Sequence, residues 1–228
     1  MAKIIPAILT ADPADLQNKI NQLAGLTDFI QLDIMDGKFV PDKSVNLDVI
    51  DKLSLPSGLS LEIHLMVKDP LSYLKACRRP QIKRIFFHLE ALKNPAAVQN
   101  ILAEIKRLDC QAGLAIKSTT AVEKTKPYLD QLDSVMFLSV NPGKQGQKFI
   151  TSTFKKIKAL RQMSSKIKIA VDGGINRDNI VQLARLGVDY LSIGSAIVKS
   201  TDVPLALKQL KQELASHALT ESSQNWYF

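Results

Sequence analysis

The sequence predicts an α/β protein built as a single closed barrel of eight parallel strands, each followed by a helix. Short apolar runs alternate with amphipathic helical stretches along the whole chain, and eight of each are found. A length of 228 residues suits one such domain. A doubly wound open sheet normally has fewer units and a glycine-rich turn after its first strand. Here the run Pro6–Thr10 contains no glycine, so the closed barrel is favoured.

The expected strands are apolar runs of five or six residues, most of them ending in a polar or glycine turn. In chain order they are Ile4–Ile8, Phe29–Asp33, Leu59–His64, Arg84–His88, Gln111–Ile116, Ser134–Ser139, Ile167–Asp172 and Tyr190–Gly194.

The expected helices fill the intervals between these strands, and three of them begin with a capping residue before proline. Asp12, Asp69 and Asn94 each precede a proline at the first helical position. The expected ranges are about 13–25, 46–53, 70–77, 94–107, 119–128, 151–164, 177–187 and 203–217. Residues 1–219 are therefore assigned to the barrel domain, and 220–228 to a C-terminal tail or arm.

The composition is that of an ordinary globular protein and argues against several classes. No apolar run reaches 18 residues, which argues against a membrane span, and Pro6 interrupts a start too short for a signal peptide. A cytoplasmic location is expected. The two cysteines have no metal-type spacing and form no disulfide framework. The net charge of +8 is spread over many segments without interleaved aromatics, which disfavours nucleic acid and suits an anionic sugar phosphate.

Two aspartates lie where apolar strands run into glycine turns. Asp33 ends one strand before Gly37, and Asp172 ends another immediately before Gly173. In a barrel of parallel strands, side chains at the strand ends face one shared mouth, where substrates bind. Two carboxylates there can remove a proton from one face of a carbon and return it to the other. Asp33 and Asp172 are the predicted catalytic pair.

His64 ends the third expected strand and is expected at the same mouth. A lone histidine on an apolar strand is more often a core residue, but two carboxylates at neighbouring strand ends favour a site. Asp33, His64 and Asp172 together form a potential divalent metal site with an open position.

Three glycine-rich turns follow the last three expected strands. Glycine lets backbone N–H groups approach an anion, and the loops after strands seven and eight of such barrels frequently bind phosphate. Three consecutive turns favour phosphate binding over tight turns alone. The candidate substrate-binding residues are Gly143, Lys144, Gln145, Gly146, Gly173, Gly174, Gly194 and Ser195.

Seven segments together resemble the ribulose-phosphate 3-epimerase family, from about Lys3 to Asp202. These segments are Pro6–Leu9, Leu32–Pro41, His64–Val67, Phe87–Glu90, Ser139–Gly143, Val171–Gly174 and Gly194–Ile197.

The resemblance implies a (β/α)8 barrel and an isomerase of carbohydrate metabolism, in the pentose phosphate pathway. It implies interconversion of D-ribulose 5-phosphate and D-xylulose 5-phosphate through an enediolate, with Asp33 and Asp172 as the acid/base pair. It also implies one divalent ion (zinc, iron, manganese or magnesium) on Asp33, His64 and Asp172, and a substrate contact for His64. Possible homo-oligomers are also implied.

Several residues depart from the family pattern. Gln31 replaces a metal-binding histidine and offers only a weak amide oxygen, while Ala7 replaces a serine and Leu138 a methionine. The motif His-Pro-Glu becomes His88-Leu89-Glu90. Three outcomes stay open: a harder ion replaces zinc, the reaction needs no metal, or the chain is a paralogue. Such a paralogue would act on another ketose phosphate, such as D-allulose 6-phosphate, or bind phosphosugars without catalysis.

Overall fold

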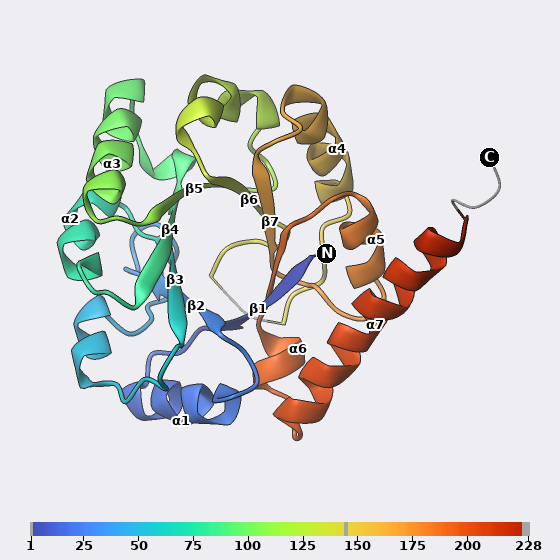
Figure 1. Ribbon diagram of the computed structural model, residues 1–228. Helices are drawn as coiled ribbons and strands as arrows, with labels where there is room; N and C mark the ends of the chain where they lie inside the picture. Colours follow the sequence, from blue (N-terminus) through green and yellow to red (C-terminus); the bar gives the residue numbers. More distant parts are fainter. Residues whose placement is uncertain (1, 144–145, 225–228) are drawn as a thin grey trace.

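The computed structural model describes residues 2–143 and 146–224 of the chain, and the side chains only as far as residue 216. Within these residues eight strands pair in parallel in chain order, and β1 closes the ring by pairing with β8. Figure 1 shows the helices arranged around the outside of the strands. The predicted single (β/α)8 barrel is confirmed.

Each predicted strand is found where the apolar run placed it, with ends shifted by at most two residues. The bounds are β1 Lys3–Ile8, β2 Phe29–Met35, β3 Ser60–Met66, β4 Ile82–His88, β5 Gln111–Ile116, β6 Ser134–Leu138, β7 Lys168–Asp172 and β8 Tyr190–Ile193.

The helical layer differs from the prediction in its detail. Two expected helices are 3-10 segments, α6 was not predicted, and α7 continues into the residues assigned to a tail. The bounds are α1 Pro13–Leu23, η1 Leu47–Lys52, α2 Pro70–Leu74, η2 Lys75–Cys77, η3 Leu89–Ala91, α3 Pro95–Arg107, η4 Val122–Gln131, α4 Thr153–Met163, α5 Ile180–Arg185, α6 Ser195–Val198 and α7 Val203–Gln224. Within the described residues, no helix is both long and apolar enough to cross a lipid bilayer.

Two of the three predicted helix caps form. Asp12 Oδ1 accepts a hydrogen bond from the Ala14 N–H at 2.9 Å, and Asn94 Oδ1 accepts one from the Ala97 N–H at 2.9 Å. The prediction for Asp69 is wrong, because its side chain makes no capping hydrogen bond. Its main-chain carbonyl instead accepts a hydrogen bond from the Ser72 hydroxyl at 2.8 Å.

Side chains alternate between a large outer core and a small inner one. Outward residues of the strands pack with the buried faces of the helices, as Ile30 and Leu32 do in one cluster with Leu16 and Ile20 of α1. Inside the barrel a separate cluster contains Phe86, Ala115, Met136 and Ala170.

Gly113 of β5 is required by the size of Phe86. A Cβ at Gly113 would lie 2.2 Å from Cδ1 of the Phe86 ring, so only glycine leaves room for it. In the strand pairing, Phe86 is beside both Gly113 and His64. This packed layer therefore supports the strand ends where the predicted site residues lie.

Candidate active site

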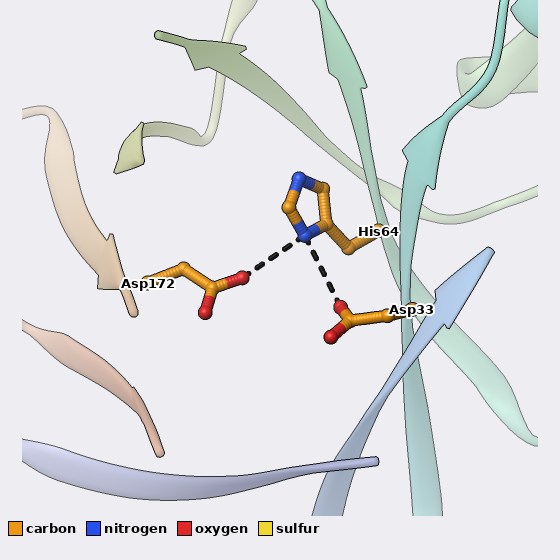
Figure 2. Close-up of side chains that lie close together, drawn as sticks. All are labelled: Asp33, His64 and Asp172. Atoms are coloured by element: carbon orange, nitrogen blue, oxygen red, sulfur yellow. Dashed lines mark hydrogen bonds and ion pairs between the residues drawn. The ribbon is translucent and has the colours of Figure 1, made fainter. Parts of the chain in front are cut away.

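Asp33 and Asp172 lie at the carboxyl-terminal part of two strands separated by β1 and β8, and they face one cavity. β2 and β7 carry them, and both side chains line the same cavity. Figure 2 shows the two carboxylates converging on the same ring nitrogen of His64 of β3. The strand pairing explains part of this geometry, because Asp33 and His64 are direct neighbours in the register of β2 and β3.

Two nitrogen atoms bridge the two carboxylates. His64 Nδ1 lies 3.2 Å from Asp33 Oδ1 and 3.0 Å from Asp172 Oδ2. Gln31 Nε2 donates hydrogen bonds to the same two oxygens, at 2.7 Å and 2.8 Å. Gln31 and His64 are fully buried, and each carboxylate is 7% exposed. The site is thus a compact ring of alternating oxygen and nitrogen atoms with little access to water.

The surroundings raise the pKa values of both Asp33 and His64. Burial and the negative charge of Asp172 raise the pKa of Asp33, against the effect of hydrogen bonds from His64 and Gln31. Burial disfavours the charged form of His64, yet its hydrogen bonds and charge attraction to Asp172 and Asp33 raise its pKa to about 10. The arrangement therefore favours a proton on Asp33 and a positive charge on His64 in the same site.

The glycine turns line the other side of this cavity. Its walls include the predicted Gly143, Gly146, Gly173, Gly174, Gly194 and Ser195. Gly174 has φ +66°, and a Cβ there would lie 2.6 Å from the backbone nitrogen of Phe149, so another residue would not fit. Lys144 and Gln145 lie outside the described residues. His64 is fully buried and is not among the residues lining the cavity, so its place is behind the carboxylates.

The chain matches the model of a known protein family. The model of the ribulose-phosphate 3 epimerase family matches residues 3–198, which include all the strands and both aspartates. The chain belongs to this family. Ribulose-phosphate 3-epimerase of Mycobacterium tuberculosis is 34% identical over 223 residues, covering 95% of this chain and 94% of the relative. That of Bacillus subtilis is 32% identical over 217 residues, covering 92% and 99%.

Solved structures share the fold at much lower identity. 3-Hexulose-6-phosphate synthase from Salmonella typhimurium superposes with a TM-score of 0.70 at 15% identity, covering 94% of this chain and 99% of that one. This likeness shows the barrel fold alone.

The residues of this epimerase-family member fit a divalent cation. Asp33, His64 and Asp172 each present one ligand atom, and these atoms lie within 4.8 Å of one another. In a tetrahedral site with bonds of about 2.1 Å, neighbouring ligand atoms are about 3.4 Å apart. The N–O separations of 3.0 Å and 3.2 Å at His64 need only a small widening.

Gln31 is the fourth member of this cluster, and either its Nε2 or its Oε1 can face the carboxylates. Its Oε1 is buried and finds no hydrogen-bond partner among the described residues. Inverting the amide would exchange Nε2 for Oε1 and direct an oxygen at the space between the carboxylates. A metal-free site uses the N–H end, and a cation would use the oxygen end.

Sequence reasoning did not assign a role to His88 and Glu90. His88 Nε2 lies 3.0 Å from His64 Nε2, and His88 Nδ1 lies 3.2 Å from Glu90 Oε2. The signal was present, because His88 ends an expected apolar strand in the sequence just as His64 does. Leu9, Met66 and Val140 were likewise not predicted, and they form part of the apolar wall of the cavity.

Proposed function

We propose that this chain interconverts D-ribulose 5-phosphate and D-xylulose 5-phosphate by proton transfer at C3. The observation that carries the proposal is the pair Asp33 and Asp172, which face one cavity with glycine turns beside them. The names of the family and of its relatives support this substrate.

The two carboxyl groups divide the proton transfer between them. Ionised Asp172 accepts the C3 proton on one face, and the C–H electron pair forms the C2–C3 double bond of an enediolate. The carbonyl oxygen at C2 takes up the negative charge. Protonated Asp33, whose pKa is raised by burial and by the charge of Asp172, donates its proton to C3 on the other face and restores the ketone. The reverse reaction exchanges the two roles.

Two hydrogen-bonding side chains behind the carboxylates make the electrostatic potential at the reacting carbons more positive, without lining the cavity themselves. Gln31 Nε2 and the charged His64 lie within 3.2 Å of the carboxylates, inside a site almost closed to water. Preorganised donors in such surroundings act more strongly than they would in water. A divalent cation bound to Asp33, His64 and Asp172 would supply Lewis-acid stabilisation of the same oxygen. The oxygen-rich set that Gln31 completes suits manganese or magnesium better than zinc.

The glycine turns are proposed to anchor the phosphate. Gly173, Gly174 and Gly194 line the cavity, and glycine lets backbone N–H groups approach an anion closely. An anchored phosphate would hold C3 of the sugar between the two carboxyl groups. The proton transfer would then be effectively unimolecular, because the reacting groups are already in position.

Asparagine at either aspartate tests the proposal. Asp33→Asn or Asp172→Asn should lower kcat roughly 100- to 10,000-fold, because an amide can neither accept nor donate the C3 proton. Binding of inorganic phosphate, measured by calorimetry, should stay nearly unchanged. Exchange of the C3 hydrogen for deuterium, followed by NMR, measures the step directly.

Asp178→Asn is the matched control, because this aspartate lies in an exposed turn before α5. It should keep full activity. Full activity in both site variants would refute the assignment.

A panel of ketose phosphates separates the pentulose phosphate from the six-carbon alternative. Ala7 lines the cavity and leaves it slightly larger than a serine would, which is the feature that favours D-allulose 6-phosphate. Faster C3 exchange on the six-carbon substrate would favour that alternative. A cytoplasmic location and a homo-oligomer stay predictions.

A further inference from the structure

His88 connects the catalytic cluster to a carboxylate that lies behind it. The Nε2 atoms of His64 and His88 are 3.0 Å apart, whereas the ring centroids are 5.1 Å apart at an angle of 29°. The rings therefore meet through their nitrogen-bearing edges. Both side chains are fully buried, so no water competes for this contact.

Two imidazole nitrogens at this distance share one proton, which one ring donates and the other accepts. Glu90 decides which ring donates. Its Oε2 lies 3.2 Å from His88 Nδ1, and an ionised carboxylate is only an acceptor. His88 therefore carries its proton on Nδ1, and in its neutral form its Nε2 is free to accept.

The charge of Glu90 is secured by the loop after β5. Glu90 Oε1 accepts hydrogen bonds from the Lys117 N–H at 2.7 Å and from the Thr120 hydroxyl. Lys156 of α4 in turn donates to the main-chain carbonyls of Lys117 and Thr120, at 2.7 Å and 2.5 Å. Phe39 covers the outer side of His88, with ring centroids 4.9 Å apart.

We propose that His88 and Glu90 are positioning residues that hold His64 in the form with a proton on Nε2, so that Nδ1 faces Asp33 and Asp172. The inference deepens the proposed function and rests on it for its catalytic consequence. A proton or a cation at His64 Nδ1 is compatible with the same arrangement, because the other ring nitrogen is already committed to His88. The chain of contacts fixes both the orientation and the protonated nitrogen of a ring that joins the two catalytic carboxyl groups.

Nitrogen-15 NMR of protein labelled at histidine tests the arrangement without any substrate. The chain has three histidines, and His217 in α7 serves as the internal control. In the wild-type protein we expect protons on His64 Nε2 and His88 Nδ1, and a coupling between the two Nε2 atoms across the hydrogen bond. The same pattern is expected with chelator and with Mg²⁺. A proton on His88 Nε2 would overturn the proposal.

Glu90→Gln gives a sharper test, because it should reverse the direction of the hydrogen bonds from residue 90 through His88 to His64. The glutamine oxygen would face Lys117 and Thr120, and its amide would donate to His88 Nδ1. His88 would then carry its proton on Nε2 and donate to His64. We expect this reversal in the NMR spectrum together with a fall in kcat of roughly 10- to 100-fold at nearly constant KM.

Two further variants separate this role from general damage. Glu123→Gln removes the same charge at an exposed position on η4 and should change neither the tautomers nor kcat. Glu90→Asp retains a carboxylate and should restore the wild-type tautomers. An unchanged His64 tautomer or an unchanged kcat in Glu90→Gln would refute the proposal. If the wild-type protein fails to turn over D-ribulose 5-phosphate, the proposed function falls, and the spectra still decide the tautomers.

Discussion

The amide of Gln31 has a measurable consequence for the acidity of the proposed catalytic pair, Asp33 and Asp172. Its Nε2 donates to Asp33 Oδ1 at 2.7 Å and to Asp172 Oδ2 at 2.8 Å. Hydrogen bonds to charged groups contribute about 1.5–3 kcal/mol each. Gln31→Leu keeps a similar volume and removes both donors. A loss of about 1.4 kcal/mol from the ionised form corresponds to one pH unit.

The direction of the pKa change in Gln31→Leu follows from the protonation state that loses its hydrogen-bond donor. The hydrogen bonds favour the ionised carboxylates, so their removal makes each proton harder to lose. The proposed mechanism needs one ionised carboxylate, and its activity therefore falls on the acid side. We expect the acid limb of the profile of kcat against pH to move upward by about one unit or more in Gln31→Leu.

The free energy of unfolding should fall by less than the two lost hydrogen bonds alone would suggest. Leucine also removes Gln31 Oε1, a buried oxygen without a partner among the described residues. Relief of such an unpaired group is worth about 1–3 kcal/mol and offsets part of the about 3–6 kcal/mol of the two lost hydrogen bonds. Urea unfolding measures this balance, and kcat from pH 4 to pH 9 measures the titration. An acid limb that does not move in a folded variant would refute the bridging role of Gln31.

Three other changes test separate parts of the structure. Gln31→His should tighten zinc binding, measured by calorimetry against a competing chelator, since imidazole is the better zinc ligand; unchanged affinity would contradict the metal site. Gly113→Ala should lower the free energy of unfolding by about 1–3 kcal/mol because its Cβ would overlap the Phe86 ring, and recovery is expected when Phe86→Leu is added; a loss below about 0.5 kcal/mol would contradict this packing. Burial raises the pKa of Cys77 to about 12, so a thiol reagent should modify half-buried Cys110 first and Cys77 only after unfolding, whereas equal rates would contradict the buried position.

Periodicity in the sequence predicted the barrel strand by strand. A strand buried on both faces is a short apolar run, and eight such runs with helical intervals leave few arrangements other than a closed barrel. The short connections were less predictable. Residues 46–53 and 119–128 have helix-like composition, yet they form the 3-10 segments η1 and η4, which tertiary packing determines. Asp69 resembles a helix cap in sequence and makes no capping bond.

The sequence by itself determined which residues reach the mouth of the barrel, because a strand end is a local feature. It therefore predicted Asp33, His64 and Asp172 at one site, and Gln31, two residues before Asp33, lies on the same face of β2. Only the tertiary structure decided what these side chains do to one another. The amide of Gln31 bridges two carboxylates that lie 2 and 141 residues away along the chain, and Glu90 Oε2 lies 3.2 Å from His88 Nδ1. Which atom donates and which accepts depends on the partners within about 3 Å. Those partners come from distant segments that only the closed barrel brings together.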